Sequence, residues 1–275
     1  MSRRKVFLDN NVWNMLVEHA ELNVDELVKA YHAERIEIVG TMELHEEIIG
    51  TARRKPAKYN ALRPVWRKLV GKRNLLQLKE RHKSELTHGG TLSGALRYQS
   101  STQHLGTRHL LNERAAIDQI NDIVYERKQQ YKEKALGHKE QVRRELEASG
   151  QKPGVLPPTV TEDRIRQMAV ETVQAGPEHG LPELDPADVA YERIPSLWLL
   201  CGVVAAKELR QTRYNMSVES SDHHDRLHAA AGAYFDFLVT DDKEYRATLG
   251  LVPGLPFEIM TPSEFACWLR EGISE

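Results

Sequence analysis

Cysteine is scarce in this sequence, with only Cys201 and Cys267 among 275 residues. The two lie far apart in apolar helical patterns, which excludes a disulfide framework and a cysteine-rich metal site. Long apolar runs are missing too: the longest, residues 197–206, is too short to span a bilayer. No signal-peptide core follows the basic N-terminus. These absences predict a cytoplasmic protein with no membrane role.

The chain also lacks a large net charge, since 38 Lys and Arg oppose 40 Asp and Glu. The charges are unevenly placed, however. Residues 51–110 hold 14 basic residues against Glu80 and Glu85, so this segment is strongly basic and the remainder is acidic. Such asymmetry predicts a segment that binds a polyanion such as nucleic acid. The alternative is a solvated basic helix face that balances the acidic remainder.

Short apolar runs alternate with helical patterns at both ends of the chain. This alternation predicts an α/β fold with a parallel sheet, whose functional site lies beyond the carboxyl ends of the strands. Thr261, Pro262 and Glu264 form a capping pattern that predicts the start of a last helix. The expected strands are 6–8, 35–39, 237–240 and 257–260, and the expected helices are 12–19, 24–33, 41–50, 162–175, 186–211 and 222–234.

The middle of the chain has a different character. Helical stretches at 58–85 and 112–148 flank a Gly/Ser/Thr-rich section, residues 88–109, for which we predict a mobile loop. The prolines of residues 151–161 predict a linker. We therefore expect a mainly helical insertion over residues 51–185.

Four acidic residues lie beside the predicted strands, where a metal site could form. Asp9 ends the first strand, and Glu46 lies about one helical turn past the second. Asp225 begins the helix before the third strand, and Asp242 follows that strand. Clustered carboxylates hold Mg²⁺ or Mn²⁺ through oxygen ligands and support phosphodiester hydrolysis. Each acid alone is equally well a helix cap or a solvated residue, so the prediction rests on the joint pattern.

These residues also resemble the motifs of PIN-domain nucleases. The segment VFLDNNVWNML resembles the family's opening strand, MELHEEIIG its second motif, and DRLHAAAGAYFDFLVTDDKEY its third. The resemblance covers residues 5–50 and 222–262, and the long middle departs from it. The positions that match are Asp9 and Asn11 in the first segment, Glu46 in the second, and Asp225, Thr240 and Asp242 in the third.

The resemblance implies a PIN-like three-layer α/β/α catalytic domain, formed by residues 1–50 and 186–275 around the insertion. It implies a metal-dependent endonuclease acting on RNA more readily than on DNA, with a homo-oligomer or protein partner left open. One or two Mg²⁺ or Mn²⁺ ions would be held by Asp9, Glu46, Asp225 and Asp242. Asn11 and Thr240 would not bind the metal themselves but would orient the carboxylates or water that do. Glu47 is the alternative to Glu46, and Asp222 is a fifth acid.

The basic segment contains interleaved aromatics, Tyr59 and Trp66, which suits a surface that follows a phosphate backbone and stacks on bases. The alternative is that Trp66, with the leucines around it, is the buried side of an amphipathic helix. We expect both, with the apolar side inward and the basic side toward nucleic acid. The predicted nucleic-acid-binding residues are Arg53, Arg54, Lys55, Lys58, Arg63, Arg67, Lys68, Lys72 and Arg73.

Other interpretations of the polar residues remain open. His224 and His228 have a spacing that can bind Zn²⁺, but no HExxH motif accompanies them, so one histidine lining the catalytic pocket is the stronger expectation. A haloacid-dehalogenase-type phosphatase would need an acid where Asn11 stands, although Asp241 and Asp242 resemble its late acidic pair. A non-catalytic RNA-binding or scaffold protein is the alternative outside the enzymes.

Overall fold

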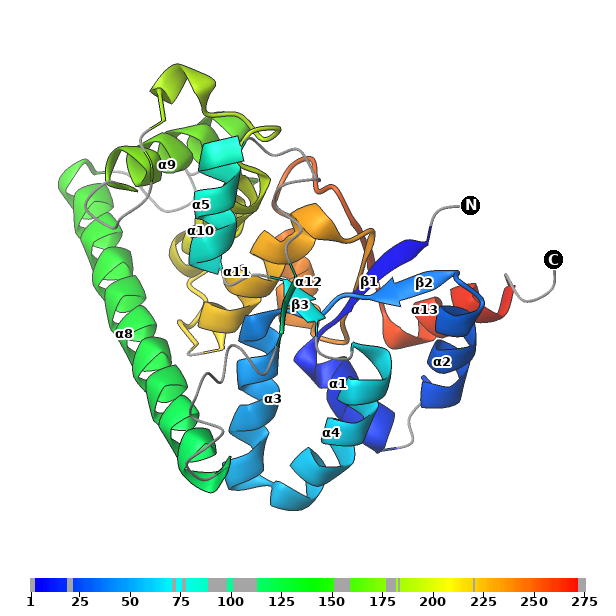
Figure 1. The fold of residues 1–275 in the computed structure, drawn as a ribbon. Helices are drawn as coiled ribbons and strands as arrows, with labels where there is room; N and C mark the ends of the chain where they lie inside the picture. The colour runs from blue at the N-terminus through cyan, green and yellow to red at the C-terminus, as the bar shows by residue number, and fades with distance from the viewer. Residues whose placement is uncertain are drawn as a thin grey trace.

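The computed structural model describes residues 3–18, 22–70, 73–75, 78–88, 98–100, 113–150, 159–176, 182, 184–219 and 221–271 (Figure 1). Its elements along the chain are β1 (Arg4–Leu8), α1 (Asn10–Val17), α2 (Val24–His32), β2 (Ile36–Ile38), α3 (Met42–Arg54), α4 (Pro56–Leu69), β3 (Arg73–Leu75), α5 (Leu78–His88), β4 (Tyr98–Ser100), α8 (Glu113–Ala148), α9 (Glu162–Gln174), η4 (Pro186–Asp188), α10 (Pro195–Arg213), α11 (Asp222–Ala230), η5 (Ala231–Tyr234), β5 (Phe237–Val239), α12 (Lys243–Leu249), β6 (Glu258–Met260) and α13 (Pro262–Glu271).

Four parallel strands form the central sheet, in the order β2-β1-β5-β6. Strand β1 is in register with both neighbours, because Val6 pairs with Ile38 on one side and Phe237 on the other. The last three residues of β1 and all of β5 are buried, as expected for a parallel sheet covered on both faces. The predicted α/β class with a parallel sheet is confirmed.

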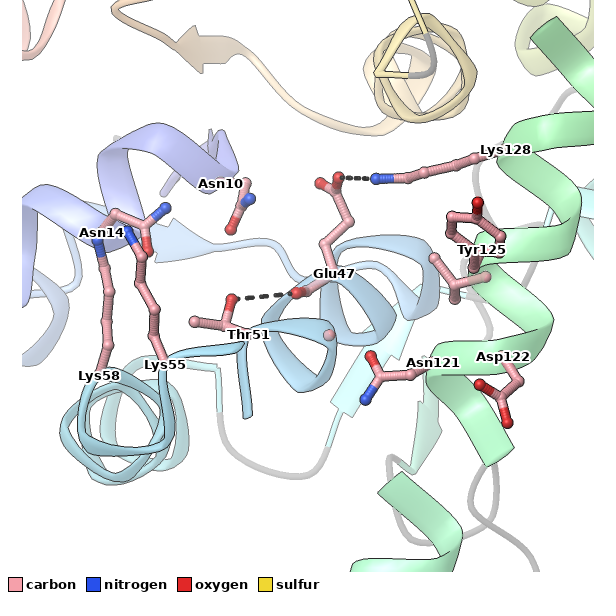
Figure 2. Close-up of a pocket in the computed structure, with 12 residues that line it drawn as sticks. Asn10, Asn14, Glu47, Thr51, Lys55, Lys58, Asn121, Asp122, Tyr125 and Lys128 are labelled. Carbon is pink, nitrogen blue, oxygen red and sulfur yellow. Dashed lines mark hydrogen bonds and ion pairs between the residues drawn. The ribbon is translucent and has the colours of Figure 1, made fainter. Parts of the chain in front are cut away.

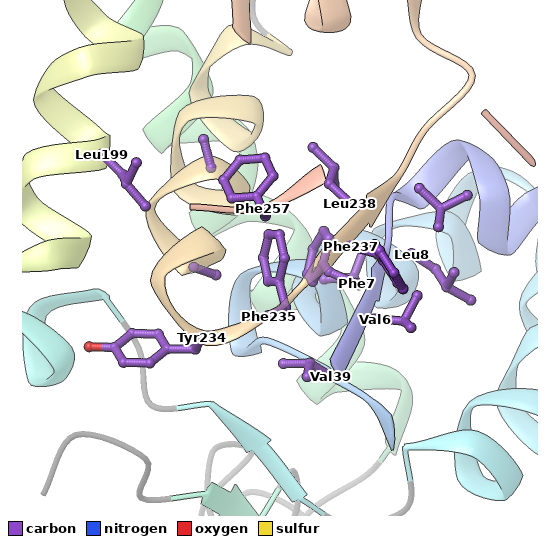
Figure 3. Packing of buried hydrophobic residues seen from close by; sticks show 14 of the residues in the cluster. Val6, Phe7, Leu8, Val39, Leu199, Tyr234, Phe235, Phe237, Leu238 and Phe257 are labelled. Atoms are coloured by element: carbon purple, nitrogen blue, oxygen red, sulfur yellow. The ribbon is translucent and has the colours of Figure 1, made fainter. Parts of the chain in front are cut away.

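Aromatic side chains show which helices cover each face of the sheet. The ring of Phe7 lies 5.3 Å from Phe235 and 5.2 Å from His228 of α11. Phe237 instead lies 5.0 Å from Trp268 of α13. Figure 3 shows Phe7, Phe235, Phe237 and Phe257 packed closely around β1 and β5. Helices α11 and α13 therefore lie on opposite faces of the sheet.

Gly232 in η5 packs directly against Phe257. A Cβ at this position would come within 2.1 Å of Cε1 of Phe257. We expect Gly232→Ala to lower the free energy of unfolding by about 1–3 kcal/mol, because the ring would have to move in a filled core. Gly137→Ala in α8 is the matched control. A Cβ there meets nothing within 4 Å, so this change should raise stability by up to about 1 kcal/mol. Urea denaturation measures the free energy of unfolding of both variants. If both variants were stabilised equally, the close contact between Gly232 and Phe257 would be contradicted.

Helices of the predicted insertion pack against the rest of the fold. The 36-residue helix α8 lies along the side of the molecule away from both termini and contacts α3, α10 and α11 (Figure 1). Helix α4 buries Leu62, Trp66 and Leu69, as its amphipathic pattern predicts. The Trp66 ring lies 4.9 Å from Trp13 of α1. Trp66 is therefore a core residue, and the predicted burial of its helix face is confirmed.

Two predicted helices differ from the structure. The stretch 58–85 is interrupted by β3, which pairs antiparallel with β4 inside the predicted loop 88–109. That pairing joins residues far apart in sequence, so local composition gave no sign of it. The helix expected at 186–211 begins only at Pro195, which suits a first helical position. His88 ends α5, and apart from it and β4 the predicted loop lies outside the described residues, as do residues 151–158 of the predicted linker.

Helix α5 carries buried polar side chains that its basic composition did not predict. Arg81, His82 and Glu85 are all buried. The carboxylate of Glu85 accepts hydrogen bonds from the hydroxyl of Tyr234 and, at 3.1 Å, from the backbone N–H of Ser196. Nη2 of Arg81 lies 3.5 Å from Oε1 of Glu43. These contacts attach α5 to α3 and α10, so the basic segment is only partly a solvated surface.

His82 makes stability depend on pH. Burial, with a smaller contribution from Arg81, lowers the pKa of His82 from 6.5 to about 3. The folded state therefore favours neutral His82, and this contribution is complete above pH 6.5 and is lost as pH falls toward 3. We expect the free energy of unfolding to fall by about 1.4 kcal/mol per pH unit from this residue below pH 6.5.

Urea denaturation between pH 7.5 and 4.5 measures this effect. His82→Gln should reduce the slope of stability against pH, whereas the control His32→Gln, at an exposed site in α2, should leave it unchanged. Identical slopes in the wild type and His82→Gln would contradict the assignment.

Candidate active site

Asp9 lies at the carboxyl end of β1 and is 6% exposed. Its Oδ1 accepts a hydrogen bond of 2.7 Å from the backbone N–H of Asn10, which caps α1. Its Oδ2 accepts one of 2.9 Å from the hydroxyl of Thr240, directly after β5. The two residues meet because β1 and β5 are parallel neighbours. Thr240 thus orients the carboxylate of Asp9.

Glu47, rather than Glu46, faces Asp9. Nε2 of His228 lies 3.5 Å from Oε2 of Glu47, and Nδ1 of the same ring lies 3.5 Å from Oδ1 of Asp9. Oε2 of Glu46 instead lies 3.4 Å from Nη1 of Arg127 in α8. Neighbouring residues of a helix point about 100° apart, so only one of the two can face the sheet's edge. The structure places the alternative acid, Glu47, at that edge.

Asp222 and Asp225, in the first turn of α11, share a lysine from α10. Nζ of Lys207 lies 2.5 Å from Oδ1 of Asp222 and 2.9 Å from Oδ2 of Asp225. Lys207 is 5% exposed. Burial raises the pKa of Asp225, and the positive charge of Lys207 opposes that rise. The lysine therefore compensates a carboxylate pair away from bulk water.

Asp242 follows β5 and is the N-cap of α12. Its Oδ1 accepts a hydrogen bond of 2.9 Å from the backbone N–H of Tyr245. Its own N–H donates to the hydroxyl of Thr240 at 3.1 Å. Asp242 also lines a cavity of about 240 Å³ together with Asp222, Asp225 and Lys207. Asp242 thus caps a helix, as the alternative interpretation predicts, and it also lies beside the other acids.

Tyr245 links the two groups of carboxylates. Its hydroxyl donates to the backbone carbonyl of Asp225 at 2.9 Å, and the residue is almost completely buried. Burial raises the pKa of Tyr245 well above 10, and the negative charges of Asp225, Asp9, Asp242 and Glu47 raise it further. Hydrogen bonds thus connect Asp9 to Asp242 through Thr240, and Asp242 to Asp225 through Tyr245. His228 lies between Asp9 and Glu47, and we call these four acids the acidic centre.

Two histidines of α11 face this centre. Burial lowers the pKa of His228, but Asp9, Glu47 and Asp225 outweigh it and the pKa is raised overall. His224 behaves differently, because burial and nearby positive charges lower its pKa well below 6.5. The centre therefore combines His228, which favours its charged form, with His224, which favours its neutral form. Burial raises the pKa of Glu47, and His228 opposes that rise.

A cavity of about 590 Å³ opens beside Glu47. Figure 2 shows Lys55 and Lys58 on one wall, Tyr125 of α8 on the other, and the Glu47 side chain between them, directed toward Lys128. Nζ of Lys128 lies 3.4 Å from Oε1 of Glu47. Nζ of Lys58 lies 2.5 Å from Oε1 of Glu18, so two of the three lysines in this cavity already have an acidic partner.

The predicted nucleic-acid-binding residues divide into three groups. Lys55 and Lys58 line the cavity. Arg63, Arg67 and Lys68 lie along α4, where Nζ of Lys68 is 3.8 Å from Oδ1 of Asp25. The side chains of Arg53, Arg54, Lys72 and Arg73 lie outside the described residues. Asn11 is exposed in the first turn of α1, and Asn10 and Asn14 line the cavity instead.

The centre's donor chemistry suits a hard divalent cation, since most of its ionisable side chains are carboxylates with oxygen donors. Several buried polar atoms beside them have no hydrogen-bond partner in the described part of the chain: Oδ1 of Asn10 and Asn14, Nδ1 of His224 and both ring nitrogens of His228. Within that part, however, no three His, Cys, Asp or Glu side chains are grouped so that they could hold a metal ion as they stand. Binding would require Lys207 or His228 to move from between the acids.

Sequence reasoning missed three residues of the centre. Lys207 lies within an apolar helix, Lys128 lies in a run of mixed charges, and Tyr245 follows the acidic pair that drew attention. Lys207 and Lys128 belong to no quoted motif, and Tyr245 ends the third quoted segment without a role assigned to it. The burial of a lysine among leucines and valines in α10 was the one available signal, because a buried lysine requires an acidic partner.

Comparison with protein-family models, with curated proteins and with solved structures finds no match for this chain. The PIN-domain resemblance thus rests on its motifs. No helix in the described ranges is both long and apolar enough to cross a lipid bilayer.

Proposed function

We propose that this protein is a metal-dependent endonuclease with a PIN-like catalytic domain that hydrolyses phosphodiester bonds, in RNA more readily than in DNA. One observation carries the proposal. His228 lies 3.5 Å from both Asp9 and Glu47, and Thr240 is hydrogen-bonded to both Asp9 and Asp242 at the carboxyl edge of the sheet. A cavity whose walls include three lysines adjoins them.

The acidic residues would hold Mg²⁺ or Mn²⁺, with Glu47 in the place that the motif assigned to Glu46. The chemistry supplied by such an ion is activation of a water for attack on a phosphodiester. Thr240 keeps the carboxylate of Asp9 oriented through its 2.9 Å hydrogen bond. Lys128 does the same for Glu47 from the opposite wall.

Binding of the substrate would fall to the lysines of the cavity. Lys55 would offer its charge to phosphates directly, and Lys58 and Lys128 would do so on leaving Glu18 and Glu47. The amides of Asn10, Asn14 and Asn121 offer hydrogen bonds. Tyr125, which is 57% exposed on α8, offers a ring for base stacking. Helix α8 thereby supplies one wall of the site, and α1 with the start of α4 supplies the other.

A second candidate is nucleic-acid binding without hydrolysis. Positively charged side chains already lie between the acidic residues, which favours this candidate. Lys207 pairs with Asp222 and Asp225. His228 lies between Asp9 and Glu47 in the same way. When the protein's own cationic side chains balance the negative charge of the acids, a metal ion is not required to balance it.

The two candidates are separated by one experiment on the full chain. Single-stranded RNA and DNA of the same sequence are incubated with the protein in Mn²⁺, in Mg²⁺ and in EDTA, and thermal stability is followed under the same conditions. The proposal requires cleavage that EDTA abolishes and a rise in melting temperature with metal. Binding of RNA without cleavage and without metal stabilisation would support the second candidate.

A further inference from the structure

A cavity of about 370 Å³ lies between α8, α10 and α11, behind the acidic centre. Its lining is mostly cationic or neutral, with Glu208 as the one acid among the described residues that line it. A volume of this size accommodates a phosphate group with part of the molecule that carries it. The side chains that matter here are Arg127, Tyr131 and Lys134 of α8, Lys207 of α10, and His223 and Arg226 of α11.

Arg226 is a half-buried cation without an acidic partner in the described part of the chain. Its guanidinium lies 4.4 Å from the centre of the Tyr131 ring. Its Nη2 lies 3.1 Å from Nδ1 of His223. Its Nε is buried with no hydrogen-bond partner in the same part of the chain. A partly buried charge with only neutral partners is costly, and an anion in the cavity would relieve that cost.

The partners of Arg226 also fix its orientation. Because a guanidinium only donates, Nδ1 of His223 is the acceptor of the 3.1 Å hydrogen bond from Nη2 of Arg226. The tyrosine ring supports the guanidinium plane from one side. A guanidinium held in this way keeps its other N–H groups for a planar or tetrahedral oxyanion.

The remaining charges around the cavity are already compensated. Glu208 lies 3.2 Å from Nε2 of His138 and 3.4 Å from Nη2 of Arg164. Lys207 binds Asp222 and Asp225, and Arg127 binds Glu46. Lys134 is exposed at the rim and makes no ion pair within the described ranges. Arg226 and Lys134 are thus the cations available to a ligand.

We propose that the cavity between α8, α10 and α11 binds a phosphate group, which Arg226 and Lys134 hold together. The phosphate is either free or part of a nucleic acid. Because Lys207 lines this cavity and also binds Asp225, the phosphate site shares a wall with the acidic centre. The proposal does not depend on hydrolysis, since anion binding is measured without a reaction.

Isothermal titration in EDTA and low salt tests the site, with inorganic phosphate as the first probe. Wild-type protein should bind it, and Lys134→Gln should weaken the binding about tenfold. Arg226→Lys should weaken it by a similar factor, because it keeps the charge and loses the planar fork. Lys132→Gln is the matched control on the same helix, outside the cavity lining, and should bind as the wild type does.

A second arm identifies the source of the phosphate. A short oligonucleotide with a 5′-phosphate and its 5′-hydroxyl counterpart compete with inorganic phosphate for the wild type and for Lys134→Gln. Competition only by the phosphorylated strand assigns a terminal phosphate, and equal competition assigns the backbone. The proposal is overturned if the wild type binds no phosphate at millimolar concentration, or if Lys134→Gln and Lys132→Gln bind it equally. Lys134 is exposed, so its variant tests the site even if Arg226→Lys does not fold.

Discussion

Glu47→Gln is expected to reduce metal-dependent nuclease activity by about 100-fold or more, whereas Glu46→Gln should have little effect. The two residues are neighbours in α3 and carry the same carboxylate. Only Glu47 approaches the centre, through His228 and beside Asp9. Glu46 is directed to Arg127 of α8. The two substitutions make the same chemical change in the same helix, so a difference in activity between them reports on the geometry of the site.

Initial cleavage rates on single-stranded RNA at saturating Mn²⁺ measure the effect, and circular dichroism confirms that both variants fold. Asp9→Asn provides a positive reference, since it removes the carboxylate that Thr240 orients. If Glu46→Gln abolished cleavage and Glu47→Gln did not, the active centre would lie on the other side of α3. If both glutamate variants kept full activity, a role for α3 in the reaction would be contradicted.

Lys207→Met is expected to lower the free energy of unfolding by about 3–5 kcal/mol at pH 8, because it leaves two largely buried carboxylates without their cation. The side chains of Asp222 and Asp225 are only 17% and 21% exposed. Methionine nearly keeps the length of the lysine side chain, so the loss of charge dominates. Lys243→Met, in the exposed first turn of α12, is the control and should change stability little.

The pH dependence of this loss has a defined sign. Burial raises the pKa of Asp225, and removing Lys207 takes away the charge that opposed the rise. A carboxyl group with a raised pKa in the folded state destabilises that state as pH climbs through this pKa. The deficit of Lys207→Met should therefore shrink toward pH 4 and grow toward pH 8.

Urea denaturation at both pH values in EDTA measures the deficit. Under the proposed function, Mn²⁺ should recover part of it at pH 8, since the freed carboxylates can bind the ion. A deficit that is the same at pH 4 and pH 8 would mean that Lys207 contributes through packing alone.

Local patterns predicted much of the framework. The apolar run before Asp9 became β1, and the Thr261 and Glu264 pair became a capping box in which each binds the other's backbone N–H. These features depend on contacts within a few residues, which a sequence displays directly. The pairing of β3 with β4 depends on residues far apart in the chain, and the pattern of basic residues concealed it.

For the candidate site, the sequence by itself determined that Asp9 and Asp242 follow the carboxyl ends of parallel strands, because strand periodicity and the order of elements are local properties. Only the tertiary structure decided between Glu46 and Glu47, since the choice depends on the rotation of α3 about its axis relative to β1 and α8. It also brought Lys207, His228 and Lys128 to the acids from three helices. Close-packed helices, not neighbouring residues, create that electrostatic environment.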